Sequence, residues 1–453
     1  MKIHHMMADF QPLGGVFSAT RWWIFNKNML YSFQFFSNPR ESMMYKRNIS
    51  ESIKTALQDT PIVFLNGARQ TGKSTLVKWL IENNHMSAFY NLDNMTTFAS
   101  IQADPVGFIS NIKENLTIDE VQKIPELVLA IKNAVDTDRR PGRFLLTGSA
   151  NVLNLPEISD SLAGRMEILS LWPLSQGEIK GKKEGFVDEL FSSEFSVKQY
   201  DSMDFEQLST AIVIGGYPEV LTRKKSERRD AWFNSYITAL LQKDVKDIAD
   251  IENLVVLPRL FRLLATRAST LLNNAELARS SAIPQTTLKR YMSLLETMFL
   301  INTVSPWSNN ISKRLVKTPK IFFNDTGLLS YLLNIDQERL FLQRDLLGAL
   351  LENFVVVELK KQITWSQKKP ELFHFCSQAG QEVDVILEDR AGRCVGIEVK
   401  ASSTVTQKDF NGLKAFAELT NKKFLHGIVL YTGDQSVPFG DNLFALPINA
   451  LWD

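Results

Sequence analysis

Short apolar runs and amphipathic stretches alternate along the chain after residue 44. Residues 61–65 are β-branched and aromatic and predict a buried strand, whereas residues 75–82 carry apolar side chains at helical spacing. Further strands are predicted at 116–120, 143–147 and 166–171. This alternation predicts an α/β domain with a parallel sheet over residues 45–180.

The middle of the chain, residues 181–310, changes to a helical pattern. A polar connection is followed, from residue 207 onward, by apolar side chains at helical spacing. Residues 274–280 and 284–295 predict two helices joined by a short turn, and the apolar run 300–304 would begin a wing. We therefore predict a helical region that contains a winged helix.

The predicted helix-turn-helix leaves four side chains facing outward: Gln285, Thr287, Lys289 and Arg290. In DNA-binding proteins such residues enter the major groove. Winged helices also serve as structural or protein-binding modules, and only two of the four side chains are basic. DNA contact is therefore one of two interpretations of this segment.

Residues 311–453 again predict an α/β domain. An apolar helix at 347–359 precedes strands at 371–375, 383–387 and 395–400. Residues 1–44 differ from both regions, because they are aromatic but have no sustained helical or alternating period. We expect them to form a poorly ordered extension, with Met43 or Met44 as a natural start of translation.

The composition narrows the functional classes. Lys plus Arg number 51 and Asp plus Glu number 50, and this balance excludes a globally basic protein while allowing a local basic patch. Two cysteines are too few for a disulfide framework and suit a reducing cytosol. No stretch approaches the ~18 apolar residues of a membrane span. We expect a cytoplasmic protein with no membrane partner.

A phosphate-binding motif lies between the first predicted strand and helix. Residues 67–74, Gly-Ala-Arg-Gln-Thr-Gly-Lys-Ser, fit G-x-x-x-x-G-K-[ST] at every fixed position. The backbone N–H groups and the helix N-terminus would hold phosphate oxygens, Lys73 would reach the β- and γ-phosphates, and Ser74 would bind Mg²⁺. The predicted nucleotide-binding residues are Gly67, Ala68, Arg69, Gln70, Thr71, Gly72, Lys73, Ser74 and Thr75.

Carboxylates at a neighbouring strand end would complete this site. Asp119 would bind Mg²⁺, and Glu120 would orient or deprotonate the attacking water. Thr147, or else Ser149 or Asn151, would sense the γ-phosphate or the water. Arg165 would stabilise transition-state charge, within the chain or across a subunit boundary, unless it forms a surface salt bridge.

The C-terminal domain holds a second group of chemically suggestive residues. Glu352 lies among apolar residues of its helix and needs a partner or a metal. Glu398 and Lys400 share one face of their strand, and Asp384 could join them from the neighbouring strand. In a PD-(D/E)XK nuclease, Asp384 and Glu398 would hold Mg²⁺ and Lys400 would position water. Acid-x-Lys is common on exposed strands, so cleavage stays open.

The order of these motifs resembles a family of bacterial and archaeal AAA-type P-loop ATPases with a C-terminal region related to PD-(D/E)XK nucleases. The resemblance implies an AAA-type parallel sheet, then a helical and winged-helix segment, then a nuclease-like α/β domain. Besides the P-loop, the shared landmarks are residues 90–93, 118–125, 145–149, 162–165, 215–218, 313–314, 319–327, 351–354 and 382–384.

These observations predict a Mg²⁺-dependent protein that binds and hydrolyses ATP and couples its nucleotide state to DNA or a protein partner. One alternative is an ATP-gated nuclease, and a second is a regulatory switch with little turnover. DNA would be contacted through the winged helix or the C-terminal region. A homo-oligomer is the assembly in which Arg165 would act across subunits.

Overall fold

The computed structural model describes residues 45–83, 85–148, 162–193, 195–241, 256–310, 312, 314, 318–377 and 379–453. Residues 45–453 form one unit, separate from residues 1–44. The predictions for residues 1–44, Ser149 and Asn151 lie outside the described residues. Among the helices described, none is both long enough and apolar enough to cross a membrane.

A five-stranded parallel sheet forms the first part of the described chain, with strand order β2-β3-β4-β1-β5. The strand that precedes the P-loop is therefore flanked by β4 and β5, and β4 separates it from β3. The elements are α1 (Ser50–Asp59), β1 (Ile62–Asn66), α2 (Lys73–Glu82), β2 (Ala88–Asn91), α3 (Met95–Ala103), α4 (Pro105–Asn111), β3 (Leu116–Asp119), α5 (Pro125–Thr137), β4 (Phe144–Thr147) and β5 (Met166–Ser170).

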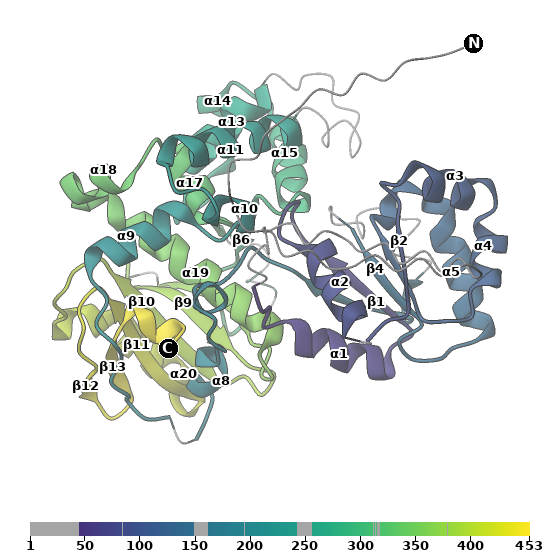
Figure 1. Cartoon of the computed structure of the whole chain (residues 1–453). Coiled ribbons are helices and arrows are strands. Elements are labelled where there is room, and N and C mark those ends of the chain that lie inside the picture. The colour runs from purple at the N-terminus through teal and green to yellow at the C-terminus, as the bar shows by residue number, and fades with distance from the viewer. Residues whose placement is uncertain are drawn as a thin grey trace, which may run out of the picture. The chain divides into compact units, whose positions relative to one another are not determined.

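Helices cover both faces of this sheet, and the residues of its interior strand β1 alternate between the two apolar cores that they form (Figure 1). Val63 and Leu65 pack with α1 and α2, whereas Ile62 and Phe64 pack with α3, α4 and α5. β1 is buried along its whole length, as expected for an interior strand of a parallel sheet. The predicted P-loop α/β fold with a parallel sheet is confirmed.

The middle region is helical. Its elements are α7 (Gln176–Lys180), α8 (Phe186–Leu190), α9 (Phe205–Ile214), α10 (Pro218–Leu221), α11 (Ser226–Ala239), α13 (Val256–Ala265), α14 (Asn274–Ser281), α15 (Gln285–Thr297), β6 (Ile301–Val304), β7 (Lys320–Phe323), α17 (Thr326–Leu332) and α18 (Gln337–Leu342). Two glycines pack closely here. A Cβ on Gly216 would lie 2.2 Å from the Leu174 carbonyl oxygen, and one on Gly327 would lie 2.3 Å from that of Ile214.

α14 and α15 are followed by the antiparallel pair β6–β7. Leu288, Tyr291 and Leu295 of α15 are buried, as the apolar pattern predicts. A short bridge also joins Leu271, just before α14, to Lys320 of β7. The predicted boundary between residues 310 and 311 falls between these two paired strands.

A six-stranded mixed sheet forms the last part of the chain, with order β12-β13-β11-β10-β9-β8. α19 packs on one face through Val395 and Ile397 of β10, and α20 packs on the other against Gly396 (Figure 1). The elements are α19 (Leu347–Trp365), β8 (Glu371–Cys376), β9 (Glu382–Glu388), β10 (Cys394–Lys400), α20 (Asn411–Thr420), β11 (Phe424–Tyr431), β12 (Val437–Gly440) and β13 (Leu443–Pro447).

Candidate functional site

The P-loop joins β1 to α2 at the carboxyl edge of the parallel sheet. Its backbone passes through positive φ angles at Gly67 (145°), Gln70 (62°) and Gly72 (96°). Gly72 is the residue before α2 and adopts the left-handed conformation that glycine tolerates best. Gly67 is also needed for space, because a Cβ there would lie 2.2 Å from the Leu171 carbonyl oxygen.

Lys73 is buried at the start of α2, and its Nζ donates hydrogen bonds of 2.9 Å to the carbonyl oxygens of Gly67 and Ala68. Burial lowers the pKa of Lys73 to about 8, and the carboxylates of Glu120 and Asp119 partly oppose this shift. A lysine ammonium kept this far from water is suited to a polyanionic ligand, which would supply its counter-charge.

Asp119 and Thr147 lie together at the ends of the neighbouring strands β3 and β4. The Thr147 hydroxyl donates a hydrogen bond to Asp119 Oδ1 and accepts one of 3.2 Å from the Glu120 N–H. Asp119 and Thr147 are both buried, while Glu120 is half-buried and has a left-handed backbone with φ of 62°. Left-handed backbone at a non-glycine residue is strained and is often found at functional sites.

These residues fit a magnesium nucleotide. The Ser74 hydroxyl and the Asp119 carboxylate are hard oxygen ligands of the type that Mg²⁺ prefers. The P-loop, the helix N-terminus and Lys73 provide backbone donors and a cation at the same edge of the sheet. The structure thus brings together the residues that the sequence predicts for the two strand ends and the P-loop.

Arg165 is placed differently. Its Nε lies 2.5 Å from Asp136 Oδ1 of α5, and one of its terminal nitrogens donates to the Ala163 carbonyl oxygen at 3.2 Å. The surface salt bridge, which is the second interpretation of the sequence, is therefore the arrangement seen within this chain.

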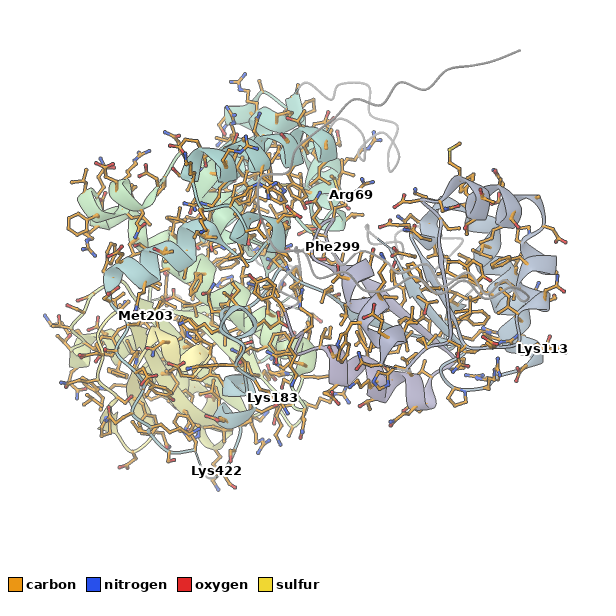
Figure 2. The ribbon with its side chains drawn as sticks, viewed as in Figure 1. Arg69, Lys113, Lys183, Met203, Phe299 and Lys422 are labelled. Atoms are coloured by element: carbon orange, nitrogen blue, oxygen red, sulfur yellow. The ribbon has the colours of Figure 1, made fainter. Side chains whose placement is uncertain are left out.

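Two further residues contact the P-loop and carry no sequence signal. Tyr236 of α11 donates from its hydroxyl to the carbonyl oxygen of Arg69 at 3.2 Å. Arg47, which precedes α1, donates to the Thr71 carbonyl oxygen at 2.8 Å. Figure 2 labels Arg69 in the P-loop and Phe299 in the helical region. Tyr236 and Arg47 can be recognised only from their contacts in the structure, because neither belongs to a sequence motif.

The helix-turn-helix leaves the predicted side chains accessible. Gln285, Lys289 and Arg290 are exposed, and Thr287 is half-buried. The α15 residues on the opposite face are buried against the helical core.

The C-terminal cluster brings Glu352, Asp384, Glu398 and Lys400 together. Lys400 Nζ donates to Glu398 Oε1 at 2.8 Å, and Asp384 Oδ2 accepts the Val399 N–H at 2.9 Å. Burial, reinforced by the charge of Asp384, raises the pKa of Glu352 to about 8 and that of Glu398 to about 7. The second oxygen of Glu398, Oε2, is buried and has no hydrogen-bond partner.

Lys320 of β7 is a member of this cluster that the sequence analysis does not single out. Its Nζ lies 2.8 Å from Glu352 Oε1 and 3.5 Å from Asp384 Oδ1. Glu352 thus has an ammonium partner. Within the described residues, no three His, Cys, Asp or Glu side chains are grouped so as to hold a metal ion.

The parallel sheet, the P-loop and the acidic strand end define a P-loop ATPase of the AAA type. In agreement, a family model described as "AAA domain" matches residues 59–180. Two models of domains of unknown function match elsewhere, DUF8612 at residues 205–339 and DUF4143 at residues 347–451. The resemblance predicted from the sequence is thereby confirmed at the level of an AAA-type ATPase with a DUF4143 domain.

The chain belongs to the same family as two mycobacterial proteins, Uncharacterized protein Rv2008c of Mycobacterium tuberculosis and Uncharacterized protein Mb2031c of Mycobacterium bovis. Each is 30% identical to it over 410 residues, which cover 90% of this chain and 85% of the relative.

Solved structures give weaker likenesses. The RuvB Holliday junction branch migration motor of Thermotoga maritima is 16% identical, with a TM-score of 0.29, and the match covers 57% of this chain and 89% of that chain. AMPPCP-bound DnaA from Aquifex aeolicus is 14% identical, with a TM-score of 0.22, and the match covers 54% and 86%. Neither score is high enough to carry an argument about function or assembly.

Proposed function

We propose that this protein binds ATP with Mg²⁺ at residues 67–75 and hydrolyses it. The observation that carries the proposal is Lys73, a buried ammonium at the start of α2 that interacts electrostatically with the carboxylates of Glu120 and Asp119. The backbone of the P-loop and Lys73 would hold the phosphates. Ser74 and Asp119 would bind Mg²⁺, which supplies charge neutralisation for the transferred phosphoryl group.

Glu120 is the residue that we assign to the attacking water. Its backbone N–H is held by Thr147 and its carboxylate by Gln122, so the side chain has a defined position next to Asp119. A carboxylate in such a position can orient the water and accept its proton. Arg165 is assigned no direct role within the chain because its guanidinium is engaged by Asp136. A role across a subunit boundary would require that ion pair to open.

An ATPase assay with and without DNA tests this proposal. Lys73→Ala is expected to abolish nucleotide binding, and Glu120→Gln to keep binding but lower turnover by about 10²-fold or more. Glu126→Gln, an exposed carboxylate on α5, is the matched control and should leave both unchanged. Nucleotide binding that survives Lys73→Ala would contradict the P-loop assignment. ATP binding without turnover in the wild type would instead identify a switch.

We further propose that the nucleotide state is coupled to DNA or a protein partner through the helical region. The order α14, α15, β6, β7 supports a winged helix, and its α15 presents Lys289 and Arg290 to solvent. The hydroxyl of Tyr236 connects this region to the P-loop backbone. Stimulation of ATP turnover by DNA would favour DNA as the partner.

A second candidate function is ATP-gated DNA cleavage in the C-terminal domain. The order α19-β8-β9-β10-α20-β11 and the grouping of Asp384, Glu398 and Lys400 support a PD-(D/E)XK-like domain. The Lys320 ammonium, which pairs with Glu352 and Asp384, places this function second. Mg²⁺-dependent nicking of plasmid DNA that disappears in Lys400→Ala would move it to first place.

A further inference from the structure

Arg47 makes three separate contacts although it lies outside every recognised motif. One terminal nitrogen donates to the Thr71 carbonyl oxygen at 2.8 Å, and the other donates to the Trp172 carbonyl oxygen at 2.6 Å. Nε lies 3.1 Å from Glu178 Oε2. The residue is 8% exposed, so these contacts occur away from solvent. Arginine is suited to this arrangement because its planar donors point in fixed, different directions.

The contact with Thr71 constrains the P-loop itself. In a trans peptide the carbonyl oxygen and the following N–H point in opposite directions. Holding the Thr71 oxygen therefore fixes the direction of the Gly72 N–H, at the position where the backbone has a φ of 96° and α2 begins. Backbone N–H groups at such a helix start are the donors that hold phosphate.

The other two contacts connect Arg47 to the segment after β5. Residues 171–178 begin beside the P-loop, because the Leu171 N–H donates to the Asn66 carbonyl oxygen at 2.8 Å. Glu178 closes the segment as part of a capping box with Ser175. Arg47 therefore contacts both ends of this segment, through a hydrogen bond at Trp172 and an ion pair at Glu178, and it also contacts the P-loop.

The same segment is held from its other side by α19. Lys361 Nζ donates to the Leu174 carbonyl oxygen at 2.9 Å, and Glu358 Oε2 accepts the Gln176 N–H at 2.8 Å. Lys361 and Glu358 are also paired with each other at 2.6 Å, and both are buried. Arg47 thus connects Thr71 to the backbone of residues 172–178 by two hydrogen bonds and one ion pair, and two further hydrogen bonds connect that backbone to α19.

We propose that Arg47 is a positioning residue of the nucleotide site and that it couples the Thr71–Gly72 peptide to the docking of α19 at Glu358. Nucleotide affinity then depends on the α19 contact, and α19 in turn responds to the nucleotide, because coupling between two sites is reciprocal. Arg47 contributes by orienting the Thr71–Gly72 peptide and not by its net charge, because Glu178 neutralises its guanidinium. The inference rests on ATP binding at residues 67–75.

The test measures the Kd of Mg-ADP for the full chain and its variants. Arg47→Lys keeps the charge but cannot make the three contacts together, and we expect it to weaken binding about tenfold. Arg143→Lys is the matched control. Arg143 is similarly buried, at 9% exposed, and it donates to the Ala134 and Asp138 carbonyl oxygens at 2.6 and 2.8 Å. It should leave the Kd within about twofold while lowering the melting temperature.

A double-mutant cycle tests the coupling to α19. Glu358→Gln should weaken Mg-ADP binding at least threefold in the wild-type background and have no effect in the Arg47→Lys background. Gln362→Ala is the control on the same helix, because Gln362 bonds to Val187 and Leu451 instead of residues 172–178. Equal Kd values for Arg47→Lys and Arg143→Lys overturn the positioning role, and equal effects of Glu358→Gln in both backgrounds overturn the coupling.

The outcome also separates this inference from the proposed function. A wild-type chain that binds no Mg-ADP contradicts the proposed function. A wild-type chain that binds Mg-ADP with the same Kd as Arg47→Lys contradicts only the inference. If Arg47→Lys does not fold, the Glu358→Gln variant tests the proposal alone. A Kd of Mg-ADP for Glu358→Gln equal to that of the wild type then overturns the proposal.

Discussion

Lys320 and Glu352 form an ion pair, with 2.8 Å between Nζ and Oε1, in which the side chains are only 10% and 15% exposed. The two residues come from β7, which pairs with β6, and from α19, which covers the C-terminal sheet. Because Asp384 Oδ1 is 3.5 Å from the same ammonium, Lys320 holds two carboxylates at once. Their mutual repulsion is thereby reduced without a metal ion.

Removing this ammonium is expected to destabilise the protein. At pH 9, above the pKa of about 8 of Glu352, Lys320→Met leaves Glu352 and Asp384 buried without their shared counter-charge, and breaking a buried pair in this way costs about 3–5 kcal/mol. A divalent cation added to the variant should recover part of that loss if the two carboxylates can bind it. Thermal unfolding of wild type and variant, each with and without Mg²⁺ or Mn²⁺, measures both effects.

The matched control for this prediction is the double variant Lys320→Met/Glu352→Gln. It removes both charges of the pair, so it should be more stable than Lys320→Met alone. A single variant as stable as the wild type would show that the ion pair contributes nothing. If Mg²⁺ and Mn²⁺ change the melting temperatures of the wild type and of Lys320→Met by the same amount, the two carboxylates do not bind a cation.

The nucleotide site could be predicted from the sequence because its parts follow local rules. A glycine-rich loop between a strand and a helix defines the P-loop, and parallel strands end at one edge of their sheet. Asp119 and Thr147 therefore had to lie near Lys73 once the strands were assigned. Their hydrogen bond is the kind of detail that this rule leaves unspecified.

Lys320 and Arg47 could not be predicted in the same way. Lys320 meets Glu352 across 32 residues, and Arg47 meets Trp172 across 125 residues. No periodicity connects such pairs, because tertiary packing alone decides which buried carboxylate or carbonyl each cation reaches. The partner of Arg165, Asp136 of α5, depends on tertiary packing for the same reason.

Thr147 is expected to matter more for turnover than for nucleotide binding. Thr147→Val keeps the side-chain shape but removes the hydroxyl that donates to Asp119 and accepts from the Glu120 N–H. The unpaired groups should cost about 1–3 kcal/mol of stability. Loss of carboxylate orientation should lower kcat by about 10²-fold, with a small change in the Kd of Mg-ADP.

Thr147→Ser is the control because it retains the hydroxyl. It should keep most of the turnover, and steady-state ATPase assays on the two variants make the comparison. If Thr147→Val turns over ATP as fast as Thr147→Ser, the hydroxyl does not orient the carboxylates.

Glu184 should make the stability of the protein depend on pH. Burial, followed by the charge of Glu358, raises the pKa of Glu184 to about 8. An acid whose pKa is higher in the folded state stabilises the fold fully below its unfolded pKa, near 4.5, and this contribution is lost as the pH rises to about 8. The melting temperature of the wild type should therefore fall between about pH 4.5 and about pH 8.

Glu184→Gln resembles the protonated side chain, so its melting temperature should fall less over the same pH range. Some slope should remain, because the pKa values of Glu352 and Glu398 are also raised. Glu189→Gln changes a half-buried carboxylate that is paired with Lys198, and this control should melt like the wild type. Identical pH profiles for Glu184→Gln and the wild type would contradict a raised pKa at Glu184.

DNA binding, if the proposed winged helix provides it, should depend on Lys289 and Arg290, because both are exposed on α15. Each phosphate contact that is removed lowers the slope of log K against log salt concentration by about 0.9. The double variant Lys289→Ala/Arg290→Ala is therefore expected to weaken DNA binding and to reduce the slope by about 2.

Lys422→Ala/Lys423→Ala removes two exposed charges in the C-terminal domain, where Figure 2 labels Lys422, and is the matched control. Fluorescence anisotropy with duplex DNA at several salt concentrations measures both variants. Equal slopes for the two would assign DNA contact to a surface other than α15.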